Sequence, residues 1–252
     1  MSRLVFFFAA ALLLVSRIHG QQSAGSPAAT PDPQSAAATF IPWLLQGKEE
    51  LTQMPLADVV FYATGKKVIA MDPQNEADQR VLALLRTTLD EVLKAMSEPD
   101  SPVQSVARIN EVSAPFEMMI RERLAAAEGF SCDFPKTASG KVQRSGYPDL
   151  RLVDRASGRI YYLDPKLYSA NNRTSSLRTF YFEPKVETNK INDDAVHLIL
   201  GIEHEGRKAA YWSFTRWDVI DLVKFKVRLK AEFQGSNREM YRPDAIVATS
   251  AE

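Results

Sequence analysis

The sequence predicts an α+β protein of the α/β/α type, in which helices flank a central mixed sheet and a helical N-terminal region precedes it. Two observations lead to this prediction. Apolar residues recur at helical spacing in residues 76–96 and 115–127, whereas several segments between residues 149 and 219 are rich in β-branched and aromatic residues. Helices followed by a run of strands are typical of α+β domains.

Residues 1–20 have the layout of a secretory signal peptide. Arg3 precedes an uncharged apolar run from Leu4 to Val15, and a short polar end leads to Gly20. The run is shorter than the roughly 20 residues that span a bilayer. We therefore expect a secreted or periplasmic protein with no stable membrane association after cleavage, although an uncleaved anchor is an alternative. A wrongly assigned start codon would instead leave the protein in the cytoplasm.

Four further regions follow the signal peptide. Residues 21–38 are rich in Ala, Ser, Pro and Gln and are predicted to form a flexible linker. Residues 39–110 are predicted to be a helical N-terminal region, with an amphipathic stretch at 40–56, a small hairpin in 57–71 and a strong helix at 76–96. Residues 111–235 would form the core, and residues 236–252 a C-terminal tail.

The predicted core starts with a helix over 115–127, because Pro115 suits a first helical turn and apolar residues at 116, 120 and 124 share one face. Strands are predicted at 149–153, 160–167, 177–182, 196–202 and 210–219. Residues 154–158 read as the turn of a hairpin between the first two strands. Residues 221–233 mix apolar and basic side chains, and Lys224, Lys226, Arg228 and Lys230 form an alternating basic face.

Composition limits the chemistry. The single cysteine, Cys132, excludes an intramolecular disulfide and a cysteine zinc site, and only three histidines are present. The chain has 31 basic and 31 acidic residues, but the charge is unevenly distributed. Residues 21–135 hold 9 basic and 16 acidic residues, a net charge of −7, whereas residues 136–230 hold 18 and 11, a net charge of +7. A neutral total therefore conceals a basic region that suits a polyanion.

The predicted hairpin carries the most informative residues. Side chains two apart on a strand share a face, so Asp164 and Lys166 point the same way, and the hairpin brings Asp149 beside them. Two carboxylates can hold Mg²⁺, and a lysine can orient water or stabilise developing charge, which together suit hydrolysis of a phosphodiester. In the other interpretation, Asp149 ends a turn and Asp164 and Lys166 form a surface ion pair.

Pro148-Asp149, fourteen residues, and then Asp164-Pro165-Lys166 resemble the PD-(D/E)-x-K motif of the restriction-endonuclease-like nuclease superfamily. The resemblance covers about residues 111–220 and implies that Asp149 and Asp164 bind metal, that Lys166 assists the attacking water and that a helix glutamate joins them. We assign that role to Glu117, with Glu111 and Glu122 as alternatives. Pro165 within a strand, and a polar region 169–195 where the superfamily has a helix, depart from its pattern.

The sequence therefore predicts an exported, metal-dependent endonuclease that uses Mg²⁺, with Mn²⁺ as an alternative, and hydrolyses nucleic acid, with DNA favoured and RNA as the alternative. The alternative is a non-catalytic exported module that binds nucleic acid or another polyanion on the same fold. A homodimer is one option for the oligomeric state. The basic residues expected to contact phosphate are Lys141, Arg144, Arg173, Arg178, Lys185 and Lys190.

Overall fold

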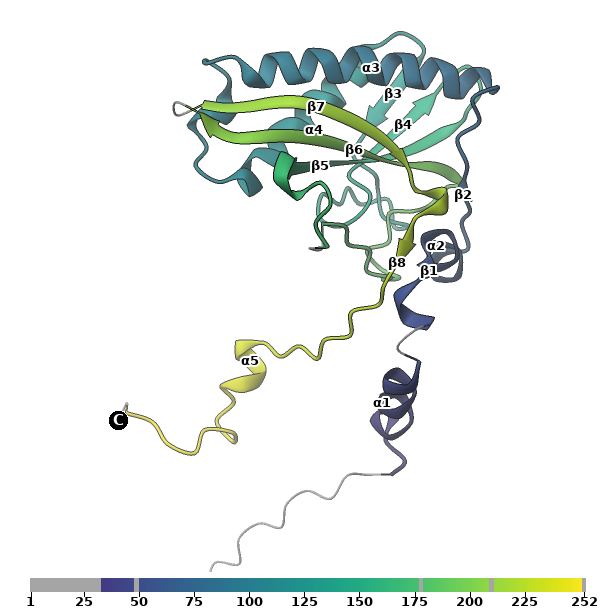
Figure 1. Ribbon diagram of the computed structural model, residues 1–252. Coiled ribbons are helices and arrows are strands. Elements are labelled where there is room, and N and C mark those ends of the chain that lie inside the picture. Colours follow the sequence, from purple (N-terminus) through teal and green to yellow (C-terminus); the bar gives the residue numbers. More distant parts are fainter. Residues whose placement is uncertain (1–32, 48–49, 177–178, 209–210, 251–252) are drawn as a thin grey trace, which may run out of the picture. The chain divides into compact units, whose positions relative to one another are not determined.

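The computed structural model describes residues 33–47, 50–176, 179–208 and 211–250 (Figure 1). The predicted signal peptide at 1–20 and most of the predicted linker lie outside these ranges, as does Arg178. The chain divides into two compact units, residues 1–47 and 48–252. No helix in the described ranges is long and apolar enough to cross a membrane.

The described part of the first unit contains one helix, α1 (Ala36–Gln46). Ser35 caps it by accepting a hydrogen bond from the backbone N–H of Ala38. The predicted linker at 21–38 thus ends in helix, because a capping serine followed by three alanines favours helix strongly.

The second unit is built on a six-stranded mixed sheet, which confirms the predicted fold class. The order is β2-β6-β5-β4-β3, and β7 also pairs with β6. β6 runs parallel to β2 and β5, and the remaining pairs are antiparallel. The strands are β2 (Val68–Ile69), β3 (Phe130–Asp133), β4 (Leu150–Asp154), β5 (Ile160–Ser169), β6 (Ala195–Lys208) and β7 (Tyr211–Asp221). A second, two-stranded sheet pairs β1 (Met54–Pro55) with β8 (Lys226–Val227).

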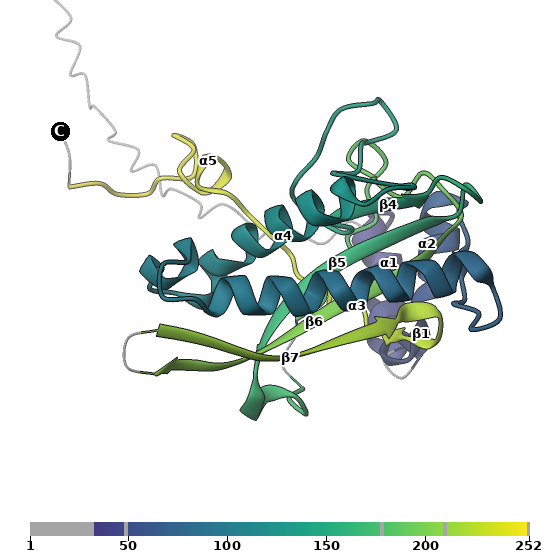
Figure 2. The same cartoon turned by 90° about the horizontal axis from the view of Figure 1, so that it is seen from above.

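Helices cover both faces of the sheet. The helices of this unit are α2 (Leu56–Thr64), α3 (Glu76–Ser97), α4 (Ile109–Ala126) and the short α5 (Asn237–Met240). α3 and α4 lie on one face (Figure 2), where Leu85, Leu89 and Phe116 pack with Leu152 and Leu163 of the hairpin strands. On the other face, a smaller apolar cluster contains Leu56 and Val60 of α2 together with Tyr147, Tyr162 and Leu222.

In the described part of this unit, short 3₁₀ turns lie at Glu50–Thr52, Pro102–Ser105, Ala170–Asn172 and Leu222–Lys224. The helix predicted at 76–96 and the turn at 154–158 are confirmed within a residue or two. α3 shares its hydrophobic cluster with the sheet, so the predicted boundary at residue 110 has no counterpart in the packing.

Three predicted elements differ. The segment expected to form a hairpin at 57–71 contains α2, because Leu56 and Val60 bury one helical face and Gly65 ends the helix with φ at 71°. α4 starts at Ile109 instead of Pro115, since Val112 extends its buried face by one turn.

The third difference concerns residues 177–182. The described residues 179–182 form no strand. Phe180 and Phe182 instead pack edge-to-face against Tyr147, with ring centroids 5.0 and 6.1 Å away. Aromatic enrichment there reflects packing of a loop against the sheet and not strand pairing.

A buried carboxylate ties α3 to the hairpin. Asp78 is fully buried and accepts hydrogen bonds from the guanidinium of Arg159 at 2.6 and 2.8 Å. It also accepts from the Tyr161 hydroxyl at 2.5 Å and from the Asp72 N–H at 2.7 Å. Four donors satisfy this charge, so the start of α3 is fixed to the beginning of β5.

We expect Asp78→Ala to lower the free energy of unfolding by about 3–5 kcal/mol, because it leaves the Arg159 charge without its partner in a protected site. Glu76→Ala on the same helix is the control, since the Glu76 side chain is 89% exposed and its ion pair with Arg80 is 3.8 Å long. That change should stay within about 0.5 kcal/mol. Urea unfolding measures both, and equal effects would contradict the anchoring role.

Candidate active site

The antiparallel pairing of β4 with β5 sets the positions of the two carboxylates. Leu150 lies opposite Leu163, and the Asp149 N–H donates to the Leu163 carbonyl at 3.2 Å. Continuing the register by one residue places Asp149 opposite Asp164. Because side chains alternate along a strand, Lys166 lies on the same face as Asp164. The hairpin therefore brings together the three residues that the sequence motif singled out.

Lys166 lies between the two carboxylates. Its Nζ is 2.6 Å from Asp164 Oδ2 and 3.6 Å from Asp149 Oδ2. The side chains of Asp164 and Asp149 are 2% and 14% exposed, and that of Lys166 is 30% exposed. The surface ion pair considered from the sequence is thus a largely buried triad. Ionic contacts in such a site are screened less than at the surface.

Pro165 fits this strand because β4 does not extend far enough to pair with it. The last paired residue of β5 on the β4 side is Leu163. Backbone groups two residues apart on a strand point to the same side, so the Pro165 nitrogen also faces the β4 side. No ladder hydrogen bond is lost there, while the pairing with β6 continues through Leu200.

The charge of Glu117, on α4, interacts with the charges of Asp149 and Lys166. Its side chain is 16% exposed and lies 3.3 Å from the guanidinium of Arg144. Burial and then the charge of Asp149 raise the pKa of Glu117. Glu111 and Glu122 on the same helix are exposed. The rotation of α4 thus turns Glu117 toward the hairpin.

Burial and mutual repulsion govern protonation in the triad. Burial, followed by the negative charge of Asp149, raises the pKa of Asp164 to about 7. Burial acts to lower the pKa of Lys166, but the charges of Asp164 and Asp149 outweigh it and the pKa is raised. Lys166 is therefore a cation at neutral pH and not a proton acceptor.

The donor set fits a hard divalent cation. In the described chain, Asp164 Oδ2 is buried and has no hydrogen-bond donor of suitable geometry, although Lys166 lies beside it. No group of three or more His, Cys, Asp and Glu side chains that could hold a metal occurs among the described residues. Mg²⁺ commonly takes one or two carboxylates and completes its shell with water and phosphate oxygens. Asp149 and Asp164 match that pattern.

The six predicted phosphate contacts do not form one track. Lys141, Arg144 and Lys185 are exposed. Arg173 instead forms an ion pair with Asp218 at 2.7 Å and donates to the Tyr168 hydroxyl, so it holds β5 to β7. Arg178 lies outside the described residues.

Lys190 is buried, so its predicted place among exposed phosphate contacts is wrong. It is 2% exposed, and its Nζ donates to the Gly146 carbonyl at 2.5 Å. It therefore does not belong to an exposed basic surface. Sequence alone could not distinguish it from Lys185, because its hydrogen-bond partner lies 44 positions away in the chain.

The raised pKa of Asp164 has a consequence for stability. A carboxyl with a higher pKa in the folded state binds its proton more tightly there, so its contribution to stability is lost as the pH rises from about 4 to about 7. We expect Asp164→Asn to remove this loss. The change in the free energy of unfolding that the substitution causes in the metal-free protein should therefore be more favourable at pH 8 than at pH 5, by on the order of 1–2 kcal/mol. Thermal unfolding at the two pH values measures this, and an equal effect at both would contradict the assignment.

Comparison with known proteins adds the family. The sequence model of the family described as "Type II restriction enzyme MjaV family" matches residues 50–244, which include the hairpin and α4. The curated type II restriction enzyme MjaV of Methanocaldococcus jannaschii is 29% identical over 214 residues, which cover 81% of this chain and 92% of that enzyme. The family match spans more than three quarters of the chain, and we conclude that the chain belongs to the MjaV family of type II restriction enzymes.

Proposed function

We propose that the protein is a divalent-metal-dependent endonuclease that hydrolyses phosphodiester bonds of DNA. The observation that carries this proposal is the convergence of Asp149, Asp164 and Lys166 on one face of the β4–β5 hairpin. The family and the curated relative, a type II restriction enzyme, support DNA as the substrate. A non-catalytic binding module would have no need of two buried carboxylates that repel each other.

Asp149 and Asp164 would hold the ion, with Mg²⁺ as the proposed metal and Mn²⁺ as an alternative. When bound, the ion neutralises phosphate charge and makes water a stronger nucleophile. The two carboxylates place fixed negative charge on the face of β5 that lies opposite α3 and α4. Asp164 must be deprotonated to act as a ligand, so binding of the ion strengthens as the pH rises through about 7.

Lys166 would supply a positive charge at the attacked phosphate. Its raised pKa keeps the ammonium group protonated, and its 2.6 Å contact with Asp164 fixes the group next to the metal ligands. A cation held in a protected site stabilises charge that develops on the phosphoryl oxygens. It can also orient a water molecule by donating a hydrogen bond to it.

Glu117 would act from α4 as a further acidic group beside Asp149. Burial and the charge of Asp149 raise its pKa, and Arg144 restrains its carboxylate. Of the expected phosphate contacts, the exposed Lys141, Arg144 and Lys185 would attract DNA from the basic half of the chain. Lys190 is excluded from that role by its burial and its bond to the Gly146 carbonyl, whereas Arg173 is exposed and paired with a carboxylate, as Arg144 and Lys185 are.

Export of this nuclease is also a proposal. It rests on the signal-peptide pattern of residues 1–20, which precedes the segment matched by the family. Mass spectrometry of the protein's N-terminus after expression with its natural leader tests it. A chain that begins at Gln21 agrees with export, and one that retains Leu4 to Val15 contradicts cleavage.

Asp164→Asn and Asp149→Asn should each reduce DNA cleavage by about 10³-fold, since each weakens the site of an ion that contributes several kcal/mol to the transition state. Plasmid nicking with Mg²⁺ or Mn²⁺ measures the rate, an RNA substrate tests the preference for DNA, and calorimetry measures metal binding. The control is Asp100→Asn, at an exposed position after α3. Wild-type cleavage rates in both Asp164→Asn and Asp149→Asn would refute the site.

Glu117→Gln should lower the cleavage rate or the metal affinity by about 10–100-fold, as expected for a group that supports the metal ligands. Glu122→Gln is the matched control on the same helix, because Glu122 is exposed and pairs with Arg121. If the two variants lose equal activity, or if Glu122→Gln is the more damaging, then α4 presents a different residue to the site.

A further inference from the structure

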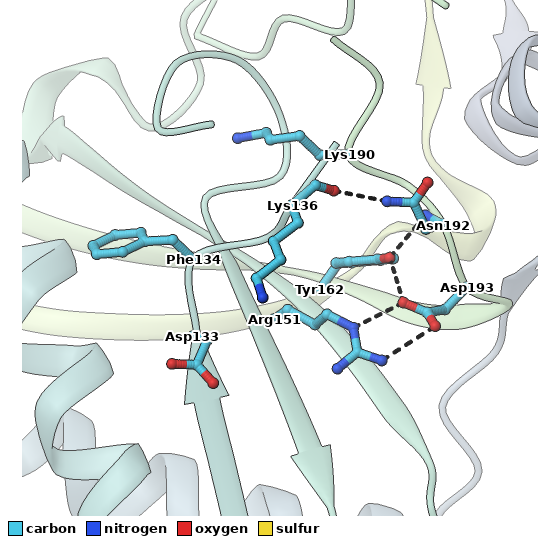
Figure 3. A pocket seen from close by; sticks show the side chains of 8 residues that line it. All are labelled: Asp133, Phe134, Lys136, Arg151, Tyr162, Lys190, Asn192 and Asp193. Carbon is cyan, nitrogen blue, oxygen red and sulfur yellow. Dashed lines mark hydrogen bonds and ion pairs between the residues drawn. The ribbon is translucent and has the colours of Figure 1, made fainter. Parts of the chain in front are cut away.

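A cavity of about 330 Å³ lies against the same hairpin (Figure 3). Arg151 and Tyr162 line it, and they face each other across β4 and β5. Each is two residues from Asp149 or Asp164 and on the same face of the sheet. At about 3.3 Å per residue, the cavity begins about 7 Å along the strands from the carboxylates.

One wall of this cavity is fixed by internal bonds. The Arg151 guanidinium donates to the Asp193 carboxylate at 2.8 and 3.1 Å, and the Tyr162 hydroxyl donates to it at 2.7 Å. Asp193 is thus already satisfied by groups of the wall, and its charge is balanced by Arg151. Figure 3 shows these three side chains in contact.

Lys136 is the cation that remains available. It lines the cavity, is exposed, and has no side-chain hydrogen bond or ion pair with any described residue. Its backbone is held, because the Asn192 side chain donates to the Lys136 carbonyl at 2.7 Å and Lys136 pairs with Val142. Figure 3 shows its side chain extending into the space that the lining residues surround. A fixed backbone therefore presents an unneutralised ammonium group to the cavity.

Lys190 connects the cavity to the active site. It lines the cavity, and the negative charges of Asp149 and Asp164 act on it, although burial lowers its pKa. Lys136, Arg151 and Lys190 together outweigh the carboxylates of Asp133 and Asp193 by one positive charge. The cavity is thus positive and lies beside a cluster of carboxylates that would otherwise repel DNA.

We propose that this cavity binds a sugar–phosphate unit of the DNA strand about one nucleotide from the cleaved phosphate, with Lys136 contacting its phosphate. The inference rests on the proposed function. The backbone winds around the helix axis while it rises 3.4 Å per nucleotide, so the step between successive phosphates through space is longer than this rise and about 7 Å corresponds to one nucleotide. The volume exceeds what a phosphate group alone needs, which leaves room for the attached sugar. Lys136 would thereby fix the register of the strand relative to Asp149 and Asp164.

The test is Lys136→Met in the full chain. With divalent metal chelated, binding of a fluorescent duplex is measured as a function of salt. We expect the negative slope of log K against log salt to become shallower by about 0.9, as for the loss of one phosphate contact. The affinity at low salt should fall about fivefold. In plasmid cleavage with metal, KM should rise while kcat at saturating DNA stays at the wild-type value, because Lys136 does not touch the reacting atoms.

Two further variants sharpen the test. Lys94→Met, on the opposite face of the sheet in α3, should leave the salt slope unchanged, and Asp133→Asn, which removes an anion from the cavity, should strengthen binding. An unchanged slope for Lys136→Met, an equal change for Lys94→Met, or a fall in kcat would each overturn the inference while leaving the nuclease assignment in place. Failure of the wild type to bind or cleave DNA would refute the proposed function itself.

Discussion

The antiparallel register between β4 and β5 is the constraint on which the candidate site depends. A shift by one residue would turn Asp164 and Lys166 toward the apolar face beneath α3 and α4. The turn resists such a shift, because Asp154 accepts from the Ala156 N–H and the Ser157 hydroxyl, and Gly158 adopts a φ of 72° that other residues rarely adopt. The Asp78 anchor then fixes the first residues of β5 to α3. The site is thus positioned by the turn and the anchor, both of which lie outside it.

The charges of the site are arranged for function at a cost in stability. Asp164 is buried next to a second carboxylate, and only Lys166 offsets this repulsion among its close contacts in the described chain. A divalent cation would relieve the repulsion more fully than one ammonium group does, and such unfavourable burial is retained where an incoming ligand needs it. The same reasoning explains why Lys190 is tolerated in a buried position nearby, where the carboxylates favour its charged form.

Local patterns in the sequence predicted the hairpin, its turn, α3 and the motif residues. Alternation along a strand and the period of a helix depend on residues that lie close together in the sequence. They failed where distant residues decide the structure. α2 is helical because Leu222 and Tyr162 bury one of its faces, and β3 was not predicted because its four residues pair with β4 only after the sheet forms. Glu111, Glu117 and Glu122 are equivalent candidates in the sequence, and only the rotation of α4 distinguishes them. Lys136 gave no signal, since a single lysine in a polar loop becomes informative only once a cavity surrounds it.

One face of β5 packs in the core and the other carries the site, which explains why stability and chemistry are closely coupled in this fold. Tyr161 and Leu163 pack beneath α3 and α4, whereas Tyr162, Asp164 and Lys166 alternate with them and face the opposite side. Each apolar residue that fixes the strand in the core therefore fixes a polar neighbour in the site. Loss of packing on the α3 face would displace the carboxylates, and a bound cation or DNA strand would in turn stabilise the register of the strands.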